Sequence, residues 1–155
     1  MTFGFCKLTG KRGTFVKSHL IPTSVTRPST PGKPFIEAGL GRRPVRRWDS
    51  WYDKELVIRA GEDILSGYDD AGLVELRKHG LLWSGRPFDA IPDVMILDPE
   101  HGFGIREING VDGESLRIFF LSLLWRAATS RRSEFSEVQL SPSNLEQLRL
   151  MVLKR

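Results

Sequence analysis

Four arginines and three large aromatic residues lie close together in the N-terminal third of the chain. The arginines are Arg42, Arg43, Arg46 and Arg47, and the aromatic residues after them are Trp48, Trp51 and Tyr52. Guanidinium groups donate paired hydrogen bonds to phosphate oxygens, and exposed aromatic rings stack on unpaired bases. We therefore predict that the protein binds nucleic acid, with DNA favoured, through Arg42, Arg43, Arg46, Arg47, Lys17, Trp48 and Trp51. The alternative is that the rings pack in the core while the arginines extend into solvent.

The distribution of charge along the chain also indicates an anionic partner. The whole chain has a formal net charge of +4, but residues 1–52 hold ten basic and two acidic side chains, a net charge of +8. Residues 53–155 hold the remaining 13 basic and 17 acidic side chains, a net charge of −4. A basic segment of this kind attracts polyanions unless its cations pair with carboxylates elsewhere in the fold. We therefore place the predicted anionic partner at the N-terminal third.

Two short stretches near the N-terminus carry a family resemblance. Cys6-Lys7-Leu8-Thr9-Gly10 is followed by Val16-Lys17-Ser18-His19-Leu20-Ile21-Pro22. Together they resemble the opening of HNH-type nuclease domains, which have a treble-clef (ββα-metal) fold. In that family a Cys-x-x-Cys-Gly knuckle precedes a hairpin that ends in a histidine, two aliphatic residues and a proline. The resemblance covers the first 20 residues well and residues 55–70 weakly.

The resemblance implies a nuclease mechanism. It makes His19 the general base that activates water against a phosphodiester, and it places Ser18 on the side of the catalytic metal ion. A neutral imidazole can accept a proton near pH 7, while a divalent cation such as Mg²⁺ or Mn²⁺ stabilises charge on the phosphate. The ligands of that cation stay unassigned, because Ser18 is a poor ligand and spacing does not choose among Asp49, Asp53, Glu62, His79 and His101.

The chain departs from the family pattern at the structural zinc site. Thr9 stands in the place of the second knuckle cysteine, and Ile58 and Gly61 stand where a later Cys-x-x-Cys is usual. Because Cys6 is the only cysteine, neither a structural zinc ion nor an internal disulfide is expected. We expect Cys6 to be an inert buried side chain and the hairpin to be held by the packing of Phe3, Phe5, Phe15 and Val16.

Local patterns predict a mixture of strands and helices. Strands are expected at 14–16, 56–58, 93–97 and 103–108. An extended loop is expected over 23–34, continuing through 39–47. Helices are expected at 62–79 with a break at Gly67 or Asp69-Asp70, at 112–129 as an apolar core helix, and from Ser141, where a capping serine precedes a proline. Asp98 to Gly102 predicts a hairpin loop, in which His101 belongs either to a solvated turn or to a metal site.

These elements predict an α+β fold. We expect one domain over 1–155, with a degenerate treble-clef, HNH-like hairpin and basic arm at 1–52 and an α+β body at 53–155 that has a small antiparallel sheet and C-terminal helices. A content of 40% hydrophobic and 27% charged residues argues against disorder, and the sequence shows neither a targeting signal nor an apolar run long enough for a membrane, so we expect a cytoplasmic protein.

Two function classes remain open from the sequence. In the first, the protein is a metal-dependent endonuclease that uses His19. In the second, the domain lacks catalysis and is a binding or regulatory module, such as an inhibitor or defence-related component, that recognises nucleic acid or another protein. Its oligomeric state is not indicated by the sequence.

Overall fold

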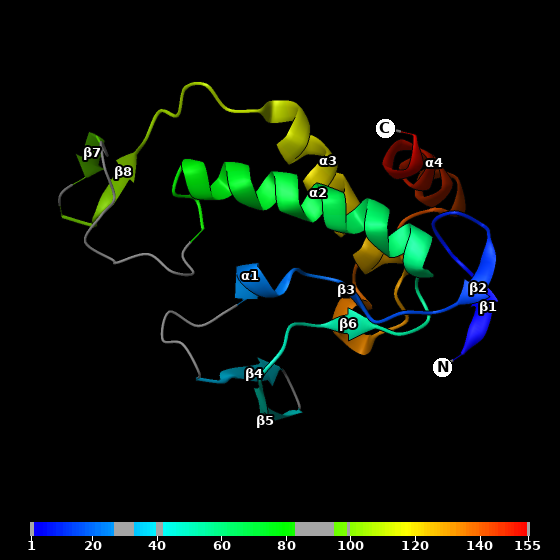
Figure 1. Ribbon diagram of the computed structural model, residues 1–155. Helices are drawn as coiled ribbons and strands as arrows, with labels where there is room; N and C mark the ends of the chain where they lie inside the picture. Colours follow the sequence, from blue (N-terminus) through cyan, green and yellow to red (C-terminus); the bar gives the residue numbers. More distant parts are fainter. Residues whose placement is uncertain (1, 27–32, 40–41, 83–94, 99, 155) are drawn as a thin grey trace.

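The computed structural model describes residues 2–26, 33–39, 42–82, 95–98 and 100–154, with the backbone alone for Arg42, Met95 and Ile96. Helices and short antiparallel strand pairs are both present, which confirms the predicted α+β class (Figure 1). The strands are β1 (Phe3–Phe5), β2 (Arg12–Thr14), β3 (Ser18–His19), β4 (Phe35–Gly39), β5 (Arg42–Arg47), β6 (Tyr52–Asp53), β7 (Met95–Asp98) and β8 (Phe103–Ile105). The helices are α1 (Thr23–Thr26), α2 (Arg59–Lys78), α3 (Gly113–Thr129), the 3₁₀ helix η1 (Ser133–Phe135) and α4 (Pro142–Leu153).

Helix α2 is the central element of the fold. It packs against α3, and α3 packs against α4, while the β1–β2 and β7–β8 hairpins lie towards its opposite ends (Figure 1). The helix runs without the predicted break, because Gly67 faces open space and Leu65 and Tyr68 remain buried on its inner face. It stops at Gly80, which adopts φ +62° so that Leu81 N–H reaches the carbonyl of Leu76 at 2.7 Å.

The two C-terminal helices begin where the sequence predicts. The Asp112 side chain accepts the Ser115 N–H at 3.0 Å, and Ser141 accepts the Asn144 N–H at 3.2 Å just before Pro142. Side-chain acceptors at these positions satisfy backbone donors that the helix itself leaves unpaired. No helix in the described ranges has the length and apolar character needed to cross a bilayer.

Instead of one small antiparallel sheet, the described strands form separate pairs, β1–β2, β3–β6, β4–β5 and β7–β8. The strand predicted at 14–16 ends at Thr14, and the one predicted at 56–58 is reduced to a single bridge between Ile58 and Phe15. The hairpin predicted around 98–102 is present as β7–β8, although its second strand ends at Ile105. Residues 93 and 94 of the strand predicted at 93–97 lie outside the described residues.

The loop predicted over 23–34 and 39–47 is wrong at 23–26 and at 42–47, while residues 27–32 lie outside the described residues. Residues 23–26 form one helical turn, α1, and β4 and β5 form an antiparallel hairpin in which Phe35 lies opposite Arg47 and Ile36 opposite Arg46. Strand β5 lacks the usual apolar alternation. The hairpin is held to the body by the Trp51 ring, whose centroid is 5.7 Å from that of Phe35.

The core lies between α2, α3, α4 and the segments that precede α2. Phe119 of α3 is buried directly over Gly72 of α2, where an added Cβ would be 2.4 Å from the ring carbon Cγ. Helix α3, which was predicted to be an apolar core helix, is not buried on all sides, since Phe120 and Leu124 are exposed. The predicted packing of the first hairpin is corrected in part: Phe15 and Val16 contact the core, whereas Phe3 and Phe5 are exposed and flank the Arg12 guanidinium.

Candidate functional site

Strand β3 presents two side chains in different environments. In the antiparallel pairing with β6, Ser18 lies opposite Asp53 and His19 opposite Tyr52. Successive residues of a strand point to opposite faces. The Ser18 side chain is accordingly buried, while 29% of the His19 side chain is exposed. The pairing therefore supports an accessible imidazole on a fixed backbone.

The His19 imidazole is held by a carboxylate and a hydroxyl. Its Nε2 lies 3.0 Å from Asp49 Oδ1 and 3.3 Å from the Thr23 hydroxyl, and that hydroxyl also donates to Asp49 Oδ1 at 3.1 Å. A carboxylate only accepts hydrogen bonds, so it favours the neutral tautomer that carries its proton on Nε2. In this tautomer the lone pair of the ring is on Nδ1, which can accept a proton.

Asp49 is kept ionised by its neighbours. Burial alone would raise its pKa, but hydrogen bonds from Lys17, His19 and Thr23 outweigh that effect and lower the pKa to about 2. The Lys17 ammonium also lies 4.3 Å from the centre of the Tyr52 ring. A cation, a carboxylate and an imidazole are thus adjacent at the surface, and the carboxylate is negatively charged at neutral pH.

A second carboxylate approaches β3 from the first turn of α2. Glu62 is near enough to Ser18 and His19 to interact with both, and its pKa is raised because burial outweighs the favourable influence of the Ser18 hydroxyl. Ser18 Oγ and Glu62 Oε2 are both buried and near each other, but within the described part of the chain neither atom forms a hydrogen bond of normal geometry. Buried polar atoms normally have partners, so this pair stands out as incomplete.

Arg126 of α3 supports the site from the helical core. Its guanidinium is buried and donates to the His19 carbonyl oxygen at 2.9 Å, to both carboxylate oxygens of Asp69, and to the carbonyl and hydroxyl of Ser122. These contacts engage all three guanidinium nitrogens. Arg126 therefore braces the backbone of His19 and has no donor left for a ligand.

The residues considered as metal ligands separate into two groups. Asp49 and Glu62 lie near His19, whereas Asp53 accepts a hydrogen bond from Ser130 at 2.9 Å. His79 pairs with Glu75 at 2.8 Å near the end of α2, and His101 pairs with Asp98 at 2.8 Å on the β7–β8 hairpin. The described residues contain no group of three His, Cys, Asp or Glu side chains placed to hold a metal ion.

At the knuckle positions, Cys6 packs directly against the start of α2. Cys6 is buried, as predicted; its sulfur accepts the Thr9 N–H at 3.4 Å, and Gly10 adopts φ +71° in the turn. Gly61, at the start of α2, lies against the same sulfur, which would be 2.8 Å from an added Cβ. The Cys6 sulfur is thus packed closely against the first turn of α2.

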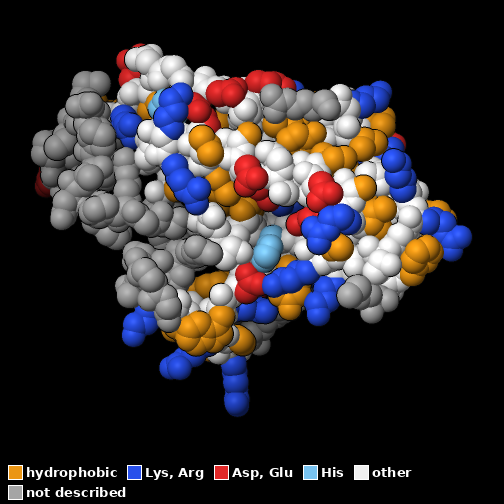
Figure 2. Space-filling model, in the orientation of Figure 1, with side chains coloured by type: hydrophobic (Ala, Val, Ile, Leu, Met, Phe, Trp, Pro, Cys, Tyr) orange, Lys and Arg blue, Asp and Glu red, His pale blue; other side chains and the backbone are white. Residues whose placement is uncertain are grey.

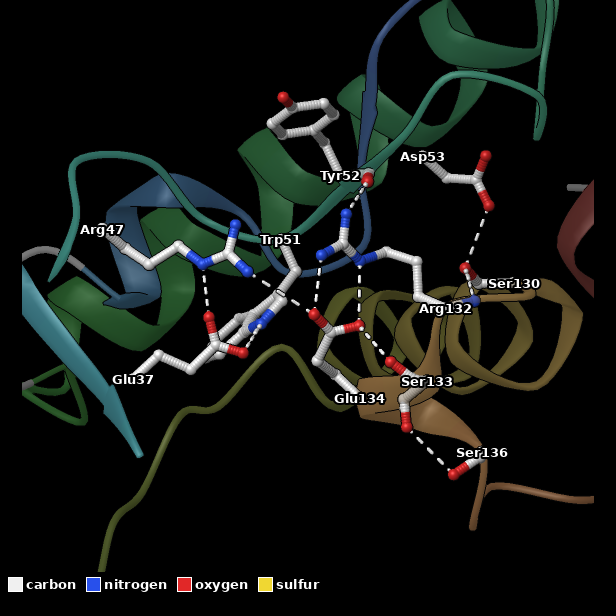
Figure 3. Close-up of polar contacts among 10 residues, drawn as sticks. All are labelled: Glu37, Arg47, Trp51, Tyr52, Asp53, Ser130, Arg132, Ser133, Glu134 and Ser136. Carbon is white, nitrogen blue, oxygen red and sulfur yellow. Dashed lines mark hydrogen bonds and ion pairs between the residues drawn. The ribbon is translucent and has the colours of Figure 1, made fainter. Parts of the chain in front are cut away.

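The predicted nucleic-acid residues do not share one environment. Arg43, Arg46 and Trp48 are exposed, Lys17 pairs with Asp49, and the Arg42 side chain lies outside the described residues. Figure 3 shows that Arg47 instead pairs with Glu37 and Glu134, two carboxylates from β4 and η1. Trp51 donates to Glu37 at 3.2 Å and packs edge-on against Phe135 (Figure 3 shows the first contact).

A cavity of about 590 Å³ lies between the β4–β5 hairpin and η1. Its lining contains Glu37, Arg43, Arg47, Glu134 and Glu137. Arg132 adds a further cation beside Glu134 (Figure 3), and its hydrogen bond holds the pKa of that carboxyl below the usual value. The cavity is therefore lined by both carboxylates and guanidinium groups, so it offers no dominant charge to an anionic ligand.

The basic side chains are spread over the visible face of the protein. Figure 2 shows Lys and Arg side chains distributed over the elements of this face, with Asp and Glu side chains between them. The positive charge of residues 1–52 is partly neutralised by pairing, as the contacts of Lys17 and Arg47 show. Exposed cations such as Arg43 and Arg46 form no ion pair within the described ranges.

Sequence reasoning left three members of the site unassigned. Asp49 had a usable signal, since it is one of only two acidic residues among the first 52 and an isolated carboxylate in a basic segment invites a local partner. Thr23 and Arg126 had none, because their roles depend on contacts between distant elements.

Comparison with protein families, with curated proteins and with solved structures gives no match to this chain.

Proposed function

We propose that the protein hydrolyses phosphodiester bonds in nucleic acid, with DNA preferred, and that His19 is the general base. The observation that carries the proposal is the 3.0 Å contact between His19 Nε2 and Asp49 Oδ1. A partly exposed base oriented by a carboxylate is the arrangement that activates a nucleophile in many hydrolases. The HNH-like order of Cys6, Ser18 and His19 along the chain gives independent support.

In this proposal the residues around His19 have distinct roles. Nδ1 takes the proton from a water molecule as that water attacks phosphorus, and the imidazolium formed is stabilised by the Asp49 carboxylate. Thr23 fixes the position of the carboxylate by donating to it. Arg126 holds the backbone carbonyl of His19, so that the ring starts from a fixed strand. The leaving 3′ or 5′ oxygen is protonated by solvent or by the imidazolium.

Glu62 is the residue that would hold a divalent cation, with the Ser18 hydroxyl beside it. The buried Glu62 Oε2 forms no hydrogen bond of normal geometry within the described residues, and Mg²⁺ is often held by one or two carboxylates together with substrate phosphate oxygens. A bound cation would supply stabilisation of the charge that develops on the phosphate. Mn²⁺ is expected to raise the melting temperature of the wild-type protein but not that of Glu62→Gln, since a ligand stabilises only the form that binds it.

The proposal is tested by cleavage of supercoiled plasmid DNA with Mg²⁺ or Mn²⁺. The wild-type protein is expected to nick the plasmid, and His19→Ala is expected to lose cleavage while keeping its melting temperature. His101→Ala is the matched control, because His101 is also exposed and paired with an aspartate but lies on the β7–β8 hairpin. Cleavage that persists in His19→Ala after purification to constant specific activity contradicts the assignment.

The second candidate function is a non-catalytic module that binds nucleic acid or a protein. It is favoured by the full use of Arg126 in internal contacts and by the lack of a three-ligand group in the described residues. The plasmid experiment separates the candidates when binding is measured on the same samples. Retention of the plasmid without nicking, in both metals, supports the binding module.

A further inference from the structure

We propose that the outer face of the β4–β5 hairpin, defined by Ile36, Arg46 and the following Trp48, binds unpaired nucleotides by stacking. The inference rests on the proposed association with nucleic acid and adds to it the form of the substrate and the residues that recognise it. It assigns these roles to one face of the hairpin and not to the whole arginine-rich segment.

The two faces of the hairpin differ in what they contact. Phe35 and Arg47 are opposite each other and face the body, where the ring of Trp51 and the carboxylate of Glu134 receive them. The neighbouring pair, Ile36 and Arg46, points the other way because side chains alternate along a strand. The inner face is thus used for anchoring and the outer face is left to solvent.

Ile36 and Arg46 on the outer face, together with Trp48 in the bend that directly follows β5, have the chemistry that single-stranded nucleic acid requires. Trp48 is 72% exposed and Ile36 is 68% exposed, and the indole makes no ring contact within the described ranges. An aromatic face on this scale can stack on a base, and Arg46 supplies a guanidinium for the adjoining phosphate. An apolar protein partner would leave the Arg46 guanidinium without a counter-charge, so charge complementarity favours a nucleic acid as the partner.

The chain connects this face directly to the candidate catalytic residues. Trp48 immediately precedes Asp49, the carboxylate that holds His19 and pairs with Lys17. A strand stacked on Trp48 therefore passes close to the imidazole. In a regular duplex both faces of each base are covered by neighbouring bases, so a Trp48 platform requires an unpaired segment, an end or a flipped base.

The test is the binding of a fluorescein-labelled oligothymidine of about 20 nucleotides, followed by anisotropy in low salt and compared with a duplex of the same length. Trp48→Ala is expected to weaken binding of the single strand by about 5- to 150-fold, the effect of losing one stacked base. Trp48→Phe should retain most of the affinity, and Arg46→Glu should weaken binding and reduce its salt dependence. The controls are Phe120→Ala and Arg77→Ala, an exposed ring and an exposed cation on α3 and α2.

Three results would overturn the inference: no binding of the oligothymidine by the wild type, equal affinity of Trp48→Ala and wild type, or tighter binding of the duplex with no effect of Trp48. Failure here is distinct from failure of the proposed hydrolysis. Loss of cleavage in His19→Ala with normal oligothymidine binding concerns His19 alone. If binding depends on Trp48 but the protein cleaves no substrate, this inference stands and the proposed hydrolysis is excluded.

Discussion

Arg126 donates a hydrogen bond of 2.9 Å to the carbonyl oxygen of His19, which lies 107 residues earlier in the chain. The same guanidinium pairs with Asp69 of α2, so one buried cation connects the candidate base to both long helices. The imidazole is consequently positioned by the helical core from its backbone side and by Asp49 from its ring side. Replacing Arg126 or Asp49 should affect the site in each case, but only the replacement of Arg126 should strongly affect folding.

Replacing Arg126 with methionine is expected to lower the free energy of unfolding by about 3–5 kcal/mol, because Asp69 is left as an uncompensated, mostly buried charge. Arg117→Met is the matched control on the same helix, since its pair with Glu114 is exposed and should contribute about 0–1 kcal/mol. Urea unfolding of both variants measures the difference. Equal effects of the two substitutions would contradict the role given to Arg126.

Gly72→Ala should destabilise the protein by about 1–3 kcal/mol, because the new methyl group would be 2.4 Å from Phe119 Cγ and the two helices would have to separate. Gly67→Ala on the same helix faces open space and is expected to stabilise by up to about 1 kcal/mol through helix propensity. Thermal unfolding of the two variants should therefore shift in opposite directions. A Gly72→Ala protein as stable as wild type would show that α2 and α3 pack less closely.

Glu62→Gln is expected to raise the melting temperature at neutral pH by a few degrees in metal-free buffer. Burial raises the pKa of Glu62, so the folded protein bears a cost for ionising this carboxyl once the pH exceeds its unfolded value, about 4.3. Below that pH the carboxyl is protonated in both states and the cost disappears. The difference between variant and wild type should therefore vanish near pH 3.5. A difference that grows on acidification would contradict the assigned sign.

Asp49→Asn should show the opposite dependence on pH. The pKa of Asp49 is lowered to about 2, so its ionised form stabilises the fold at every pH above its unfolded value of about 3.9. That contribution is lost progressively as the pH falls towards 2. Wild type should be more stable than the variant between pH 4 and 7, and the two should converge near pH 2. Parallel stability curves over this range would contradict the ion-pair network.

The helices were predictable from short-range signals. Asp112 and Ser141 are N-cap residues that act on backbone N–H groups three positions later, and Gly80 stops α2 through its own φ angle. The β4–β5 hairpin was not predictable in this way. Its second strand, Arg-Arg-Pro-Val-Arg-Arg, has no apolar alternation, and its pairing depends on anchoring by Trp51 and Glu134.

The residues of the candidate site also differ in whether short-range sequence signals could predict them. His19 and Ser18 could be singled out because their motif is contiguous in the sequence. The partners of His19 could not be chosen, since Asp49 lies 30 residues away and Arg126 lies 107 residues away. Similarly, the arginines of β5 look equivalent in the sequence, but strand alternation sends Arg46 to solvent and Arg47 to a carboxylate pair.

The most direct test of the central claim is the rate at which the protein hydrolyses a small chromogenic phosphodiester, bis(4-nitrophenyl) phosphate, with Mn²⁺ near neutral pH. This substrate needs no stacking platform, so the rate reports the chemistry at His19 separately from nucleic-acid binding. We expect release of 4-nitrophenol by the wild type and by Trp48→Ala, and at least about 100-fold slower release by His19→Ala, the scale of a lost general base. Equal rates for wild type and His19→Ala, or no release above the metal-only background by the wild type, would contradict the central claim.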